Sequence, residues 1–223
     1  MINQDADADA DTRTRLVEAA RRLFLAKGYA ATSVAEILSE ADAHSGSLYH
    51  YFATKQDLLL AVLDSYCEGI RPMLLEPAWR GVGDPLERVF ALLGSYRELL
   101  EQSAYGYGCP IGSLALGLHE PDPAVRASLA ANFRAWTAAV RECLAGAHLP
   151  TGADLDELAI TVLAVMEGAV MQSRTYGGPQ AFDACVRQLR TLFGALRAGA
   201  PMAPARGAPP PRSPRKTTRG GRR

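Results

Sequence analysis

The chain has 223 residues, and its 24 basic residues are balanced by 24 acidic ones, so a net charge of zero gives no information about nucleic acid. Its hydrophobic fraction of 48% is enough for one large packed domain or two small ones. The cysteines are too widely spaced for a zinc site or a disulfide scaffold, which indicates a reducing compartment; they are Cys67, Cys109, Cys143 and Cys185.

The first segment, residues 1–11, contains aspartates and no basic residue, and we predict that it is a disordered acidic N-terminus. It lacks the basic and then apolar pattern of a secretory signal peptide. No apolar run approaches the roughly 20 residues that span a bilayer, and the best stretch, residues 158–166, is interrupted by Thr161. We therefore expect a cytoplasmic protein that does not use a membrane.

Residues 12–58 predict three helices, of which the last two are short. The first has apolar residues at helical spacing and a stop at Gly28. Ser33 and Glu36 have the spacing of a capping box that begins the second helix, and the third is predicted at residues 45–51. A tight turn at residues 41–44 joins these two, which is typical of a helix-turn-helix motif. The third helix would enter the major groove of DNA.

Residues 59–197 continue with helical periodicity and predict a larger helical domain. Asp84 and Asp122 each precede a proline, which is the arrangement of a helix cap followed by its first turn. Since no strand alternation competes, the sequence predicts an all-α protein of about nine helices. Residues 198–223 are rich in Pro, Gly and Arg, and we predict a disordered basic tail there.

Residues 14–58 resemble the tetracycline-repressor (TetR) family of bacterial regulators without a gap. The resemblance is carried by three motifs, which are Lys27-Gly28-Tyr29, Thr32-Ser33-Val34 and Gly46-Ser47-Leu48-Tyr49-His50-Tyr51-Phe52. It implies a repressor with a three-helix DNA-binding domain, followed by a helical domain for ligand binding and dimerisation. The helix count from periodicity agrees with this arrangement.

The resemblance also implies roles for individual residues on double-stranded operator DNA. Thr32 or Ser33 would bond phosphate at the start of the second helix, and Tyr49 would do so through its hydroxyl. Lys55 would meet phosphate at the N-terminus of the fourth helix. Gly46 would allow the backbone and DNA to approach closely. The predicted DNA-binding residues are Thr32, Ser33, Ser45, Gly46, Ser47, Tyr49, His50 and Lys55.

The turn of the motif departs from the family pattern, which usually reads Ala-Gly-Val-Ser. Here Asp42 replaces the glycine, and aspartate tolerates a left-handed backbone better than most residues. His44 stands where Ser or Thr would cap the reading helix, which leaves Ser45 as an alternative cap. Residues 12–58 hold six basic and five acidic residues, so affinity must come from the local placement of polar groups.

In the C-terminal domain, the resemblance implies that helices near 154–176 and 179–197 pack against their copies in a homodimer. A two-fold dimer fits a palindromic operator with half-sites ~34–36 Å apart. The ligand pocket is expected among the middle helices, and its candidate residues are Cys109, Trp136 and Met166. Residues 105–118 are rich in glycine but contain no Gly-Lys-Ser/Thr phosphate loop. We interpret this segment as a flexible entrance to the ligand pocket.

The sequence thus predicts a repressor that an unknown small-molecule inducer releases from its operator. Three alternatives keep the same fold. One is an activator, and another is a helical interaction module that does not bind DNA. The third senses oxidants or electrophiles through Cys109, because a helix start stabilises a thiolate; a buried, inert cysteine is the simpler interpretation of that residue. An enzyme is not expected, since no catalytic triad, metal-ligand cluster or cofactor loop is visible. We expect neither a cofactor nor a metal.

Overall fold

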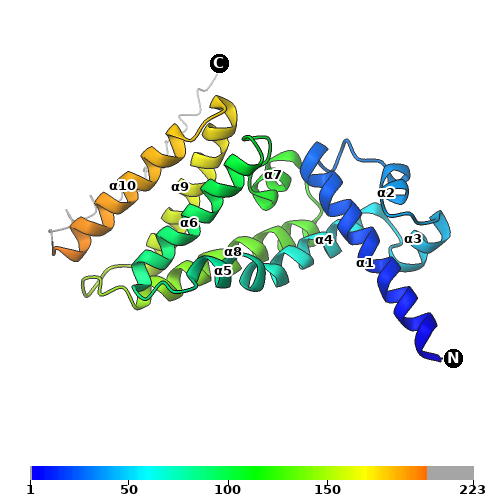
Figure 1. Cartoon of the computed structure of the whole chain (residues 1–223), viewed down its shortest axis with the longest axis horizontal. Helices are drawn as coiled ribbons and strands as arrows, with labels where there is room; N and C mark the ends of the chain where they lie inside the picture. The colour runs from blue at the N-terminus through cyan, green and yellow to red at the C-terminus, as the bar shows by residue number, and fades with distance from the viewer. Residues whose placement is uncertain (1, 200–223) are drawn as a thin grey trace, which may run out of the picture.

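The computed structural model describes residues 2–199, and every regular element in that range is helical (Figure 1). This confirms the predicted all-α class. The elements are α1 (Ile2–Lys27), α2 (Val34–Glu40), α3 (Ser45–Tyr51), α4 (Lys55–Ile70), η1 (Arg71–Leu75), α5 (Glu76–Trp79), α6 (Pro85–Gln102), α7 (Pro110–Gly117), α8 (Pro123–Ala145), α9 (Leu155–Tyr176) and α10 (Gln180–Arg197). Because α4, η1 and α5 follow one another without a break, these elements form the expected nine helical rods within residues 2–199.

The helix ends lie where the capping signals predict them. Ser33 and Glu36 form a reciprocal capping box at the start of α2, and Thr54 and Asp57 form another at the start of α4. Asp84 caps α6 by accepting hydrogen bonds from the two backbone N–H groups that follow Pro85. At these three helix starts, local side chains therefore satisfy backbone donors that the helix leaves unpaired.

The N-terminal segment differs from the prediction. Residues 1–11 were expected to be disordered, but α1 begins at Ile2, so residues 2–11 extend the first helix. Alanine has the highest helix propensity, and every second residue from position 6 to position 10 is alanine. The basic tail predicted from residue 198 lies outside the described residues from position 200 onward.

The π-helical turn η1 has no counterpart in the sequence prediction. It lies between α4 and α5, and its second residue is Pro72. Proline has no backbone N–H and cannot complete the hydrogen bond of the preceding α-helical turn, so the ladder changes its spacing here. Helices α4, η1 and α5 therefore form one long, slightly irregular rod, and the helix is not interrupted at Pro72.

The two predicted domains lie at opposite ends of an elongated molecule (Figure 1). Helices α2 and α3 pack against α1 at one end, and α9 and α10 lie side by side at the other. Helix α4 packs on α1 and on α8, so it belongs to both domains. Buried side chains run without interruption from Leu48 in α3 through Leu58 in α4 to Val140 in α8. No helix within residues 2–199 has the length and hydropathy to cross a membrane.

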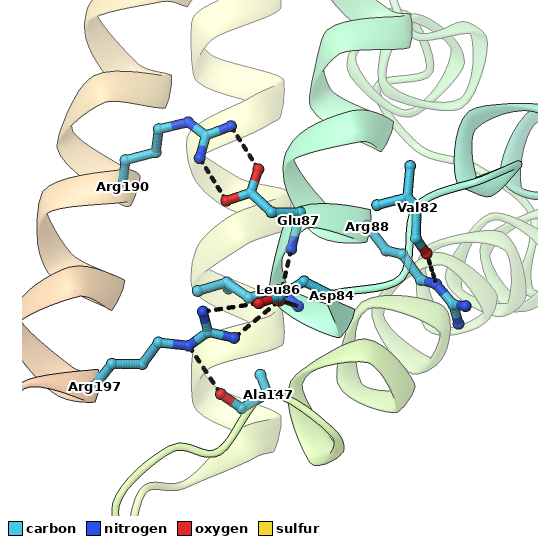
Figure 2. Close-up of polar contacts among 8 residues, drawn as sticks. All are labelled: Val82, Asp84, Leu86, Glu87, Arg88, Ala147, Arg190 and Arg197. Carbon is cyan, nitrogen blue, oxygen red and sulfur yellow. Dashed lines mark hydrogen bonds and ion pairs between the residues drawn. The ribbon is translucent and has the colours of Figure 1, made fainter.

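Ion pairs hold α10 against α6 (Figure 2). Arg190 forms two hydrogen bonds with Glu87, at 2.8 and 3.0 Å, and Arg197 reaches Asp84 at 2.9 Å. Arg197 also donates to the Ala147 carbonyl at 2.9 Å, which ties the end of α8 to the same point. These side chains are partly exposed, so solvent screening weakens each pair. Their main effect is to fix which face of α10 points outward.

Candidate DNA-binding surface and ligand cavity

Helix α3 presents polar side chains on one side and is anchored by apolar ones on the other. Leu48 is fully buried and Phe52 is 4% exposed, whereas Tyr49 is 60% exposed. Ser45, Gly46 and His50 are also exposed, and Ser47 is half-buried. A side chain at Gly46 would meet no protein atom, so packing within the protein does not require glycine there. These predicted residues therefore share one accessible surface.

The turn before α3 has the expected backbone but a different cap. Asp42 adopts a left-handed conformation with φ of 47°, as predicted for a residue that replaces glycine. His44 is the N-cap residue in extended conformation without a side-chain cap, and Ser45 is the first helical residue. The alternative cap at Ser45 is therefore wrong, because its backbone is already helical.

Arg15 holds this turn from α1 and was not identified from the sequence. Its guanidinium donates to the carbonyl oxygens of Ala41 at 2.9 Å and Asp42 at 3.1 Å. A planar fork suits two adjacent acceptors and would stabilise the left-handed turn. The contact joins residues that are far apart in sequence, so no local pattern signals it.

Thr32 does not have the role predicted from the resemblance. Its side chain is 1% exposed, and its hydroxyl donates to the Gly28 carbonyl oxygen at 2.8 Å. A buried hydroxyl that is already bonded cannot reach DNA phosphate, so the prediction is wrong for this side chain. Ser33 is exposed, and its hydroxyl forms the capping box of α2. Of the two candidates, only the Ser33 hydroxyl lies at the surface.

Lys55 begins α4 but is engaged within the protein. Its ammonium donates to the Tyr29 carbonyl oxygen at 2.6 Å and lies 4.2 Å from the centre of the Tyr29 ring. Partial burial lowers the pKa of Lys55. The contact holds Lys55 beside the loop before α2, at the first turn of α4. A phosphate at this helix end would meet the positive end of the dipole as well as the ammonium.

Other charges of the domain are neutralised between α1 and α2. Arg22 pairs with Glu40 at 3.1 Å, and Lys27 pairs with Glu36. The hydrogen bonds from Lys27 and Ser33 lower the pKa of Glu36 to about 2, so its carboxylate stays ionised. The surface around α3 therefore relies on hydroxyl, imidazole and backbone groups rather than a strong positive field.

A cavity of about 600 Å³ lies in the C-terminal domain between α4, α6, α7, α8 and α9, and it extends to α1. Most of its lining is apolar or aromatic. Cys109 and Trp136 line it, as predicted from the sequence. Met166 does not: it is 1% exposed within the core, and its neighbour Glu167 faces the cavity instead. The volume and lining are those of a small-molecule site.

Cys109 is the N-cap residue of α7, so the predicted helix start is confirmed, but its surroundings disfavour a thiolate. Burial and the neighbouring Glu167 carboxylate raise the pKa of the Cys109 thiol to about 12. The side chain is 6% exposed. Desolvation thus outweighs the helix dipole that favours a thiolate at this position.

Glu167 is the cavity residue that the sequence interpretation missed. Burial raises the pKa of its carboxyl group, and a hydrogen bond with Cys109 opposes that shift. A signal was present, since Glu167 is an acid within the apolar stripe of residues 155–170. Charged residues in such a stripe are seldom buried without a reason.

Two glycines before and within α7 have a packing role that the sequence interpretation did not include. A Cβ at Gly108 would lie 2.9 Å from side-chain atoms of Val170 and Arg174 on α9. A Cβ at Gly112 would overlap the Glu167 carboxylate. The small residues therefore let α7 approach α9 closely, and they make room for the carboxylate at the cavity wall.

The exposed surface of α9 and α10 carries apolar side chains that no described part of the chain covers. They are Ile160, Met171, Tyr176 and Leu192, with exposures of 59%, 54%, 68% and 39%. Among the small residues of these helices, Ala159 and Ala169 are buried inside the protomer, and Ala184 is exposed. This face is the predicted dimer surface.

An exposed reading helix on a three-helix domain, joined by α4 to a helical domain with a cavity, defines a helix-turn-helix DNA-binding regulator of transcription. Two family profiles agree. Residues 16–62 match the profile described as "Bacterial regulatory proteins, tetR family", and residues 85–188 match "Transcriptional regulator LmrA/YxaF-like, C-terminal domain". The chain belongs to the TetR family of transcriptional regulators and, as expected, is not an enzyme.

Relatives with names of the same kind cover most of the chain. An HTH-type transcriptional regulator of Mycobacterium tuberculosis is 28% identical over 187 residues, which are 81% of this chain and 93% of the relative. The HTH-type transcriptional repressor DhaR of Mycobacterium sp. (strain GP1) is 26% identical over 194 residues, covering 85% of this chain and 94% of that protein.

Solved structures agree with the fold. A TetR transcriptional regulator from Chloroflexus aurantiacus superposes with a TM-score of 0.74 at 27% identity, covering 84% of this chain and 96% of that one. The regulatory protein TetR from Rhodobacter sphaeroides gives a TM-score of 0.72 at 26% identity, with 79% and 95% covered.

Proposed function

We propose that this protein is a ligand-responsive repressor that binds a palindromic operator as a homodimer in the cytoplasm. The observation that carries the proposal is the exposed polar face of α3, which holds Ser45, Tyr49 and His50 at the end of the molecule farthest from α10. A helix of this kind inserts into the major groove and reads base edges. The repressor role is supported by relatives such as DhaR, whose name describes a repressor.

Helix α4 gives a physical route from ligand to DNA. Its first residue, Lys55, touches the loop beside α2, and Tyr66 and Ile70 near its other end line the cavity. A molecule that fills the cavity would displace the C-terminal half of α4. A packed helix moves as a rigid element, so the displacement would change the spacing of the two α3 helices in a dimer.

The experiment is selection of operator DNA from random duplexes by the purified protein at ~150 mM salt, where non-specific attraction is reduced. We expect one palindromic sequence to be enriched. His50→Ala should bind that operator about tenfold or more weakly, since a base contact contributes about 1–3 kcal/mol. Thermal unfolding would establish that the variant is folded, since the exposed His50 ring also contacts Tyr51.

His119→Ala serves as the matched control, because His119 is an exposed histidine on the loop after α7, outside the DNA-binding domain. It should leave operator affinity unchanged. Absence of any enriched sequence from a refolded, ligand-free dimer would refute the proposal.

A further inference from the structure

The cavity contains two polar atoms that the protein itself does not satisfy. Glu167 Oε1 is buried without a hydrogen-bond partner, and Trp136 is 4% exposed with an indole Nε1–H that faces the Tyr96 hydroxyl without reaching full hydrogen-bond geometry. Both residues line the cavity. Buried polar groups in folded proteins are nearly always bonded, so a pair of unbonded ones in a single cavity indicates groups that a ligand completes.

The charges of the lining favour a cation. Its acidic and basic side chains are Glu18, Arg21 and Glu167. Arg21 forms an ion pair with Glu18 at 2.7 Å, so these two cancel. No basic side chain within residues 2–199 forms an ion pair with Glu167. The cavity therefore has one uncompensated carboxyl group at its wall, and burial raises the pKa of that group, as expected where no cation is near.

Aromatic rings surround the same space. Tyr96 and Trp136 are in edge-to-face contact with ring centres 6.4 Å apart, and Tyr66, Phe133 and Tyr107 also line the cavity. Aromatic faces attract a cation and stack on a flat apolar ring. A ligand that has both a cationic group and a flat apolar ring would contact the carboxyl group and the aromatic rings of the cavity.

We propose that the cavity binds aromatic molecules that carry a protonated amine, with Glu167 as the partner of the ammonium group and the Trp136 indole N–H as a donor to a ligand oxygen where one is present. The inference rests on the proposed ligand-responsive function and specifies the chemistry of its effector. An ammonium group would supply a positive charge and N–H donors to Glu167 Oε1, which has no hydrogen-bond partner within the protein. An anion would meet the Glu167 carboxylate without a free cation to receive it, and a hydrocarbon would leave both polar atoms unbonded.

The test compares probes that share one ring system and differ in charge. Isothermal titration calorimetry at pH 7 would measure the affinity of the full chain for three probes. They are the amine 1-naphthylmethylamine, the alcohol 1-naphthalenemethanol and the carboxylate 1-naphthaleneacetate. We expect the amine to bind about tenfold tighter than the alcohol, because charge-assisted hydrogen bonds are roughly twice as strong as neutral ones. The carboxylate should bind most weakly.

The Glu167→Gln variant tests the assigned partner. It keeps the shape above Gly112 and removes the charge, so the amine should lose its advantage while the alcohol binds as before. Glu98→Gln is the matched control, since it removes an exposed acid of α6 that does not line the cavity. It should leave the order of the three probes unchanged. Circular dichroism would establish that both variants are folded.

Two results would overturn the inference. One is equal or weaker binding of the amine compared with the alcohol, and the other is an amine advantage that survives Glu167→Gln. Absence of binding by every probe would also refute it. Operator binding, measured on the same samples by fluorescence anisotropy, reports on the proposed function separately. A protein that binds its operator but prefers the neutral or anionic probe would keep the regulatory function and lose only this ligand class.

Discussion

Thr32 and Ser33 are adjacent hydroxyl residues that the fold uses differently. Thr32 points into the domain and donates to the Gly28 carbonyl oxygen at 2.8 Å, where it closes the loop after α1. Ser33 stays at the surface and caps α2. Because the Thr32 side chain is nearly inaccessible, it would affect DNA binding only by positioning neighbouring residues such as Ser33.

We predict that Thr32→Val destabilises the protein by about 1–3 kcal/mol, because the shape is retained while a buried carbonyl loses its donor. Urea unfolding would measure this change, and operator affinity of the folded variant should be unaltered. Ser33→Ala is the comparison: loss of the cap should cost about 0.5–2 kcal/mol and should also weaken operator binding. Weakened operator binding by Thr32→Val at unchanged stability would assign its hydroxyl to DNA after all.

The surroundings of Cys109 predict slow chemistry at its sulfur. Alkylating reagents attack the thiolate, and the pKa of this thiol is raised to about 12. At pH 8 we expect iodoacetamide to modify Cys109 at least about a hundredfold more slowly than a thiol with the ordinary pKa of about 8.5. Mass spectrometry of the labelled peptides would measure the rate, with urea-unfolded protein as the reference. Fast labelling in the folded protein would favour the electrophile-sensing alternative.

Sequence patterns predicted the residues whose roles depend on neighbours within a turn of helix. The capping box of Ser33, the cap at Asp84 and the left-handed Asp42 are of this kind. They did not predict contacts between distant segments. Arg15 reaches the turn at Ala41 across 26 positions of the chain, and its own surroundings carry no sign of that contact. The apolar pattern of α9 predicted Met166 in the cavity, but the adjacent residue Glu167 lines it and Met166 is in the core.

At the scale of elements, one residue contributes both to the start of α6 and to its attachment to α10. Asp84 accepts hydrogen bonds from Leu86 N at 2.7 Å and Glu87 N at 3.2 Å, and it also pairs with Arg197 of α10 (Figure 2). The Arg197 hydrogen bond, followed by the backbone donors, lowers the pKa of Asp84 from 3.8 to about 2. The carboxylate is therefore favoured by folding.

A lowered pKa in the folded state makes the contribution of Asp84 depend on pH. Its stabilising effect is fully present above the unfolded pKa near 3.8 and is lost as the pH falls through the folded value of about 2. Asp84→Asn retains a good cap and removes the charge, so the variant should be less stable than the unmodified protein above pH 4. The difference should shrink towards pH 2. Thermal unfolding across this range would measure it, and a difference independent of pH would contradict the assignment.

At the scale of the whole molecule, the two functional surfaces lie at opposite ends and are joined by α4 and α8 (Figure 1). The distance between these surfaces limits how two copies can be arranged in a dimer that binds DNA. If two copies meet through α9 and α10, their α3 helices must reach half-sites about one DNA turn apart. Under the proposed function, the ion pairs of α10 with α6 would hold the outer helices in place while a ligand in the cavity moves α4.

The exposed apolar side chains of α9 and α10 give the last prediction. Ile160→Asp puts a charge at a position that is 59% exposed in the protomer but would be buried between two copies. We expect it to produce a folded monomer in sedimentation equilibrium, because an unpaired charge in an interface is strongly unfavourable. Leu116→Asp is the matched control, since Leu116 on α7 is 77% exposed and lies outside this face.

Operator binding then distinguishes loss of the dimer from damage to α3. A monomer contacts one half-site, so it neutralises about half as many phosphates, and the dependence of its affinity on salt should fall by about half. Specific affinity should fall with it, whereas the Leu116→Asp protein should retain both. If Ile160→Asp stays dimeric with full operator affinity, the two copies do not meet through α9, and the apolar face requires a different partner.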